Sequence, residues 1–172
     1  AAEYSFDLPE SIPAGWTRFT LENQGAKSHD FSLMKLGEGK TLDDLTAALQ
    51  AEGPPEWVES YGMVAAEAGE RAWLAVKLDP GTYAYMSSGG DESGPDAAQG
   101  MIGTLTVTEA TGAVADPAPV TADVAVDLVD FQFVVDGAFQ AGEQVMRVGN
   151  AGTEPHEIIL FKLKEGKTQA DF

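Results

Sequence analysis

The feature that most constrains this fold is a long internal repeat. The stretch Ile12–Leu45 recurs without a gap as Phe139–Phe172, at an offset of 127 residues (142 − 15, from Gly142 and Gly15). The same offset aligns Asn23 with Asn150, Gly25 with Gly152, His29 with His156, Leu33 with Leu160, and the EGKT sequences that begin at Glu38 and Glu165. Solenoid repeats are much shorter than this period. The sequence therefore predicts two copies of one domain.

The repeat also predicts where the domains begin and end in the chain of 172 residues. Residues 110–123 are rich in Ala, Pro and Thr and poor in large apolar side chains, as is typical of an extended linker. We therefore predict a complete domain over 1–109, a linker over 110–123 and a partial second domain over 124–172. Phe172 aligns with Leu45, which lies in the first turn of a predicted helix, so the second copy stops inside an element.

Short runs of aromatic and β-branched residues, bounded by Gly, Pro, Asn or Asp, predict strands throughout the first copy. The runs are YSFDL at 4–8, WTRFTLEN at 16–23, DFSLMKL at 30–36, RAWLAVKL at 71–78, TYAYMS at 82–87 and MIGTLTVTE at 101–109. One helix is predicted, because Thr41 and Asp44 form a capping box before three leucines on one face, and GPP at 53–55 ends it. The segment 54–71 shows no clear period and is predicted as a loop. Many short strands with one short helix are typical of an all-β sandwich.

The second copy is expected to leave apolar side chains uncovered. Its predicted strands are VAVDLVDFQFVV at 124–135, EQVMRVGN at 143–150 and HEIILFKL at 156–163. Half a sandwich exposes a larger apolar face than a soluble monomer usually tolerates. Two explanations remain open: the gene product continues for most of another domain, or residues 124–172 form a homodimer with the same segment of another chain.

Composition narrows the classes of partner. The formal net charge of −18 disfavours nucleic acid and anionic lipid surfaces, and a solvated acidic face explains it most simply. No apolar run approaches the roughly 18 residues of a membrane span, so membrane insertion is not expected. The chain contains no cysteine, which excludes disulfides and thiolate ligands.

Taken in order, the motifs of the first copy resemble those of the cupredoxins, the plastocyanin-like Greek-key sandwiches. These motifs are an extended IPAG entry at 12–15, a strand closing on Asn23-x-Gly25, His29 heading the next strand, PGTY at 80–83, and Gly100-Met101 before the last strand. The resemblance covers residues 4–108 in full and 124–172 in part. It implies a Greek-key β-sandwich with one short helix, followed by the first half of a second copy.

The resemblance also implies positions for the four ligands of a type 1 copper site. His29 occupies the first ligand position, Ser87 stands where the family has its cysteine, Asp96 stands near the second histidine, and Met101 falls on the axial methionine. Thiolate is the ligand that type 1 copper most needs, and a serine hydroxyl is a hard, weak donor. We therefore expect no cofactor in the first copy. Met86 is a further candidate ligand, and His156 repeats the position of His29.

Two functions from different classes follow. The first is a non-enzymatic, extracytoplasmic binding or structural module with an unidentified protein or small-molecule partner. The alternative is a copper-handling or electron-transfer protein, which would use an unconventional site at His29 and Met101 or a complete site in the remainder of the second copy. An enzyme is not expected, because neither paired carboxylates nor a nucleophile motif accompanies the two histidines.

Overall fold

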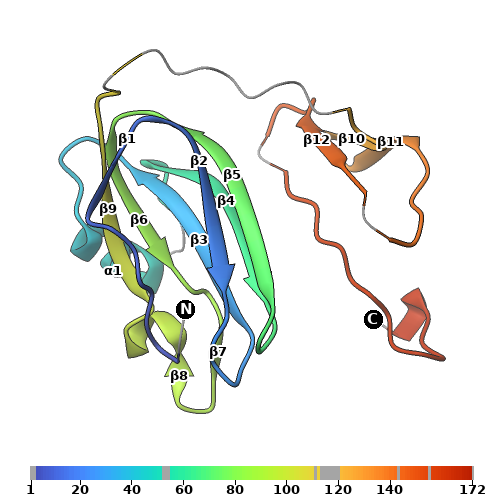
Figure 1. Cartoon of the computed structure of the whole chain (residues 1–172), viewed down its shortest axis with the longest axis horizontal. Coiled ribbons are helices and arrows are strands. Elements are labelled where there is room, and N and C mark those ends of the chain that lie inside the picture. Colours follow the sequence, from blue (N-terminus) through green and yellow to red (C-terminus); the bar gives the residue numbers. More distant parts are fainter. Residues whose placement is uncertain are drawn as a thin grey trace. The chain divides into compact units, whose positions relative to one another are not determined.

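The structure is a computed structural model that describes residues 3–51, 55–110, 112, 121–142, 144–154 and 156–171. The chain divides into two compact units, Ala1–Pro117 and Ala118–Phe172. Most regular structure is β, with one α-helix among the described residues, and a small separate sheet follows the first unit (Figure 1). This confirms the predicted fold class. In the described parts of the chain, no helix combines the length and apolar character that crossing a membrane requires.

The first unit contains two main sheets. The larger has the order β1-β9-β6-β3-β4, and the smaller pairs β2 with β5. The strands of the larger sheet are β1 (Ser11–Pro13), β9 (Ile102–Thr108), β6 (Gly81–Met86), β3 (His29–Leu36) and β4 (Val58–Ala66), and those of the smaller are β2 (Gly15–Glu22) and β5 (Arg71–Leu78). All pairs are antiparallel except β1 with β9. The hydrophobic core takes side chains from both sheets, among them Leu21, Leu33, Leu78, Tyr83 and Leu105.

The α-helix α1 (Leu42–Ala51) begins as its capping box predicts. Thr41 Oγ1 accepts a hydrogen bond from the Asp44 amide at 3.2 Å, and the Asp44 carboxylate accepts one from the Thr41 amide at 2.9 Å. Leu45 is fully buried in a second cluster with Leu36 and Ala84. Gly53 and Pro54, where we expected the helix to end, lie outside the described residues.

The prediction of a loop over 54–71 is wrong, because β4 occupies Val58–Ala66. The register with β3 shifts between Leu33 and Met34, opposite Gly62, whose φ is +114°. This bulge changes which side chains face the core halfway along the strand, so the sequence loses its period of two. The strand expected at 4–8 is also absent from those described residues, where only Ser5 forms an isolated bridge.

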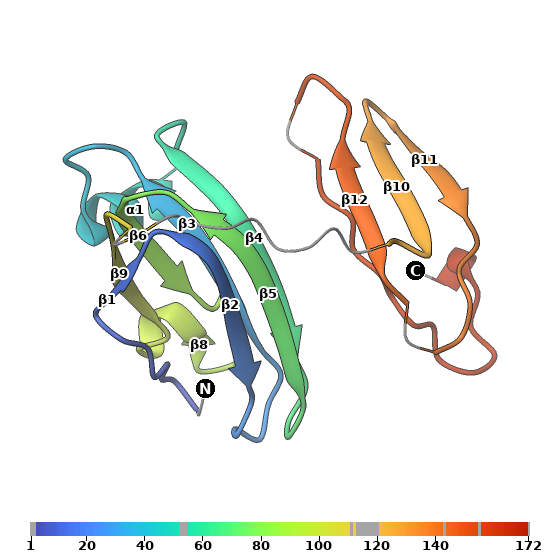
Figure 2. The same cartoon turned by 45° about the horizontal axis from the view of Figure 1, so that its top comes forward.

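The second unit is a three-stranded sheet with the order β11-β10-β12 (Figure 2). The strands are β10 (Val124–Val129), β11 (Gln132–Gly137) and β12 (Met146–Asn150). The run 124–135, predicted as one strand, is a hairpin that turns at Asp130 and Phe131, and Phe131 has a φ of +63°. Among the residues of this unit that the structure describes, the buried side chains are Val124, Val126 and Leu128, all on β10.

The prediction of a strand over 156–163 is also wrong, because these residues have no regular structure. Their counterpart is β3, which is hydrogen-bonded to β4 and β6 on its two sides. At the offset of 127, the counterparts of β4 and β6 would be numbered beyond 172. A strand needs a neighbour for its backbone groups, so the same pattern does not form a strand here.

Candidate functional site

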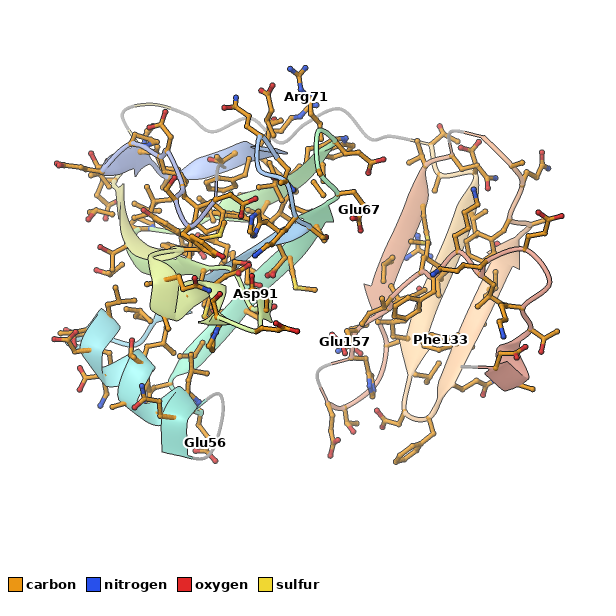
Figure 3. The ribbon with its side chains drawn as sticks, turned by 90° about the horizontal axis from the view of Figure 1, so that it is seen from below. Glu56, Glu67, Arg71, Asp91, Phe133 and Glu157 are labelled. Carbon is orange, nitrogen blue, oxygen red and sulfur yellow. The ribbon has the colours of Figure 1, made fainter. Side chains whose placement is uncertain are left out.

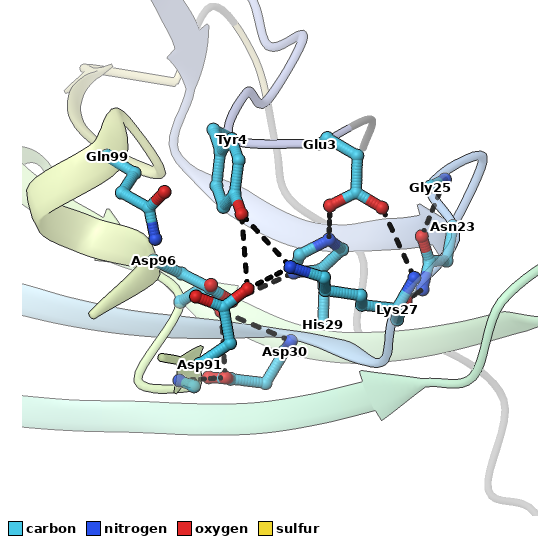
Figure 4. Close-up of polar contacts among 12 residues, drawn as sticks. Glu3, Tyr4, Asn23, Gly25, Lys27, His29, Asp30, Asp91, Asp96 and Gln99 are labelled. Carbon is cyan, nitrogen blue, oxygen red and sulfur yellow. Dashed lines mark hydrogen bonds and ion pairs between the residues drawn. The ribbon is translucent and has the colours of Figure 1, made fainter. Parts of the chain in front are cut away.

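Loops at one end of the first unit bring together three of the residues that the sequence singles out. His29 begins β3, Ser87 follows β6, and Asp96 begins the short 3-10 helix η1 (Asp96–Gln99). Between Ser87 and η1 lie two short strands, β7 (Gly90–Asp91) and β8 (Gly94–Pro95). All three side chains are buried, and the polar contacts around His29 and Asp96 are drawn in Figure 4.

The His29 imidazole is completely buried and lies between two carboxylates. Its Nδ1 is 2.8 Å from Asp96 Oδ2, and its Nε2 is 3.1 Å from Glu3 Oε2. An ionised carboxylate only accepts hydrogen bonds. Each ring nitrogen thus faces a carboxylate oxygen, and a neutral ring could donate to only one of the two.

Ser87 also contacts two carboxylates. Its Oγ is 3.0 Å from Asp96 Oδ2 and 3.0 Å from Asp30 Oδ1, so its single proton can serve either acceptor. One oxygen of Asp96 is therefore within hydrogen-bonding distance of both His29 and Ser87. A methyl group added at Gly89 would lie 3.1 Å from that same oxygen, which shows how closely the loop backbone covers it.

Asp30 supplies a second buried carboxylate beside that of Asp96, and the sequence patterns did not single it out. Its carboxylate accepts hydrogen bonds from the Ser88 amide at 2.9 Å and the Gly89 amide at 3.0 Å. The hydroxyls of Ser88 and Ser32 donate at 3.0 Å and 3.2 Å. Several hydrogen-bond donors thus surround the buried carboxylate of Asp30, which is how a protein makes carboxylate burial tolerable.

Met101 closes this loop through its backbone. Its amide donates to the Asp96 carbonyl at 3.0 Å, and its carbonyl accepts from the Ser87 amide at 2.9 Å. The Met101 side chain is fully buried. Met86 is the last residue of β6, directly before Ser87, and is half-buried.

Glu3 covers the outer side of His29. The amides of Ala26 and Lys27 donate to Glu3 Oε1. The Ala26 hydrogen bond is the main reason that the pKa of Glu3 lies below its usual value, and His29 lowers this pKa further. Next to this pair, the Lys27 ammonium forms an ion pair with Asp91, and the Tyr4 hydroxyl is 3.3 Å from Asp91 Oδ2.

The polar side chains around His29 already have hydrogen-bond partners within the protein. Among the described residues, no buried side-chain nitrogen or oxygen lacks a hydrogen bond, and no three His, Asp or Glu side chains are arranged to hold a metal ion. An unconventional metal site at His29 would have to displace Asp96 from Nδ1 or Glu3 from Nε2. The chain has no cysteine, so it has no cysteine-ligated type 1 copper site.

His156 in the second unit forms a simpler version of this contact. Its Nε2 is 2.7 Å from Asp130 Oδ1, and Asp130 also accepts from the Thr153 amide at 3.1 Å. Asp130 aligns with Glu3 at the offset of 127. The hydrogen bond from His156 is the first cause of the lowered pKa of Asp130. The acid at this repeat position was the signal that could have identified Glu3 from the sequence.

Comparison with solved structures finds matches of low sequence identity. The structure of Na-dithionite-reduced auracyanin from the photosynthetic bacterium Roseiflexus castenholzii matches over 62% of this chain and 90% of its own, with 24% identity and a TM-score of 0.46. A multicopper oxidase matches over 58% of this chain and 32% of its own, with 16% identity and a TM-score of 0.34. No model of a known protein family matches the sequence, and no curated protein matches it.

Proposed function

We propose that the first unit is a cupredoxin-like module without type 1 copper that acts outside the cytoplasm as a binding or structural module. The observation that carries the proposal is the position of Asp96 Oδ2, 2.8 Å from His29 Nδ1 and 3.0 Å from Ser87 Oγ. By the sequence resemblance, His29 and Ser87 stand at two ligand positions of a copper site. A carboxylate oxygen that bridges these two residues gives each a partner that is not a metal.

The same contacts argue against hydrolysis by Ser87. A nucleophilic serine needs a base that takes its proton. His29 is not placed to act as this base, because both of its ring nitrogens face carboxylates. Ser87 Oγ contacts the carboxylates of Asp30 and Asp96. Ser87 is also fully buried, so a substrate would not reach its hydroxyl.

Copper loading of the full chain tests the proposal. The protein is incubated with excess Cu(I) or Cu(II), dialysed against a chelator, and assayed for bound copper and visible absorbance. We expect a colourless protein that retains clearly less than one copper per chain. Stoichiometric copper after dialysis would overturn the proposal. The alternative site would then require that His29→Gln and Met101→Leu each abolish retention.

A gain-of-site variant tests the correspondence of positions. Ser87→Cys combined with Asp96→His supplies a thiolate and an imidazole where the bridging contacts now lie, and both are ligands that copper favours. We expect this variant to retain copper and to absorb strongly in the visible range. The matched control combines Ser88→Cys with Asp96→His, because the Ser88 hydroxyl contacts Asp30. Equal copper retention by both variants would contradict the assigned position of Ser87.

A further inference from the structure

Three of the five methionines of the chain flank one serine on the larger sheet of the first unit. In this sheet β3 lies between β4 and β6 (Figure 1). Ser32 on β3 is paired with Met63 on β4 and with Met86 on β6. Met34 is two residues further along β3 and therefore lies on the same face as Ser32. The group Met34, Met63 and Met86 is here named the methionine cluster.

The methionine cluster lies on the face of the sheet that points away from the core between the two sheets. Leu33, between Ser32 and Met34, belongs to that core, and successive strand residues point to opposite faces. Met34 packs instead against the smaller apolar cluster at α1. Met86 is half-buried and Met63 is 49% exposed. A dissolved ion can therefore reach this face of the sheet.

The spacing of the strands allows the three sulfur atoms to meet above Ser32. Side chains paired across neighbouring strands have Cβ atoms about 4.5–5.5 Å apart, and diagonal neighbours are about 7–8 Å apart. Met63 and Met86 lie on opposite sides of Ser32, and Met34 is a diagonal neighbour of both. A methionine side chain is unbranched and has three rotatable bonds, so each sulfur can turn toward the same point. The short side chain of Ser32 does not fill the space between them.

The charge around the methionine cluster favours a cation. Ser32 Oγ donates to Asp30 Oδ2 at 3.2 Å, so a buried carboxylate lies next to the cluster. The formal net charge of −18 also attracts cations to the chain. Thioether sulfur is a soft, neutral donor that selects Cu(I), whereas hard divalent cations prefer oxygen ligands. Three thioethers beside one carboxylate therefore suit a soft monovalent cation.

We propose that the methionine cluster binds one Cu(I) ion through the thioether sulfurs of Met34, Met63 and Met86. This site is distinct from the copper position that the sequence resemblance implies, because His29 and Ser32 are three residues apart on β3 and point to opposite faces. Three neutral donors hold the ion weakly, so dialysis against a chelator removes it. The proposal therefore does not rest on the proposed function and is compatible with it.

The test titrates the full chain with Ag(I) and follows the methionine methyl groups by NMR. Ag(I) is also a soft monovalent cation, and air does not oxidise it. We expect one equivalent of Ag(I) to shift the methyl signals of Met34, Met63 and Met86. The signals of Met101 and Met146, which lie outside the methionine cluster, should stay in place. A titration with Cu(I) under anaerobic, reducing conditions should shift the same three signals.

Leucine variants separate binding from packing, because leucine keeps the size and apolar character of methionine but lacks the sulfur. Met63→Leu and Met86→Leu should each weaken Ag(I) binding by at least about tenfold in isothermal titration calorimetry. The matched controls are Met101→Leu and Met146→Leu, which should bind Ag(I) as the unmodified chain does. Thermal unfolding without metal checks that each variant keeps its fold.

The possible failures are distinguishable from failure of the proposed function. If the chain binds no Ag(I), or if Met63→Leu and Met86→Leu bind it as tightly as the two controls, the methionine cluster is not a metal site and the proposed function is unaffected. Ag(I) binding that is lost in His29→Gln and Met101→Leu but kept in Met63→Leu would place the ion at the alternative site and would overturn both proposals.

Discussion

The two copies of the repeat share their local structure and differ in their packing. The Asn-x-Gly turns make the same hydrogen bonds, with Asn23 bonding the Gly25 amide and Asn150 bonding the Gly152 amide. Tyr4 and its counterpart Phe131 have φ values of 62° and 63°. The Thr41–Asp44 capping contact recurs between Thr168 and Asp171, where a 3-10 turn, η2 (Gln169–Asp171), replaces the start of the helix.

The two copies differ in how deeply their apolar side chains are buried. Leu33 is fully buried on β3, whereas its counterpart Leu160 is 65% exposed in a segment without regular structure. Many apolar side chains of the second unit are exposed in the same way, and Phe133 is one of them (Figure 3). The comparison teaches that turns and caps follow from a few neighbouring residues, while a strand forms only where other strands supply hydrogen bonds and apolar contact.

The largest expected effect comes from the matched leucines. Leu33→Ala should destabilise the first unit by about 2–5 kcal/mol, because it opens a cavity in a packed core. Leu160→Ala should change stability by no more than about 0.5 kcal/mol. Urea denaturation measures both, with tryptophan fluorescence for the first unit, which contains all three tryptophans, and circular dichroism for the whole chain. A large loss with Leu160→Ala would mean that a partner or further chain buries this face in solution.

A smaller difference is expected for the acids that follow the two histidines. Asp30→Ala should destabilise the first unit by about 2 kcal/mol, because the Ser88 and Gly89 amides lose their acceptor. Its counterpart Glu157 is exposed, so Glu157→Ala should be close to neutral. The same denaturation experiment compares them. Similar losses in the two variants would show that Asp30 contributes through charge alone and not through its hydrogen bonds.

The smallest effect concerns the acids that contact the histidines. The folded-state pKa values of Glu3 and Asp130 are both lowered. Their contacts therefore stabilise the fold above the ordinary carboxyl pKa of about 4, and this stabilisation is lost as the pH falls through the lowered pKa. Carboxyl NMR titration should show both shifts. His156→Gln should raise the pKa of Asp130 more than His29→Gln raises that of Glu3, because Ala26 contributes most at Glu3. The opposite order would contradict this assignment of causes.

Much of the first unit could be predicted from residue patterns. The run RAWLAVKL coincides with β5, and the capping box locates α1, because alternation and capping are local properties. β4 was missed, since the bulge at Gly62 interrupts its alternation. The run HEIILFKL predicts a strand by the same kind of pattern, yet the given sequence does not contain counterparts of β4 and β6, the strands that pair with β3.

The candidate site was only partly visible in the sequence. Family spacing singled out His29, Ser87 and Asp96, whose side chains meet in one network. Asp30 and Glu3 were missed for different reasons. Asp30 lies next to His29 on β3, where alternation predicts an outward side chain, but the loop after β6 folds over it. Glu3 lies far from His29 in the chain, and only its repeat counterpart Asp130 indicates a role.

The acid–histidine contact also constrains the last glycine of each Asn-x-Gly turn. A methyl group added at Gly152 would come within 2.6 Å of His156 Nε2 and even closer to Asp130, and one added at Gly25 would lie 2.8 Å from Glu3 Oε1. The backbone torsions of these glycines are not the reason for the restriction. The acid lies far from the other two positions in the chain, whereas the glycine and the histidine are only four residues apart. The three positions are nevertheless coupled, because a side chain at this glycine would displace the acid that contacts the histidine. Related sequences should vary at the acid, the glycine and the histidine together.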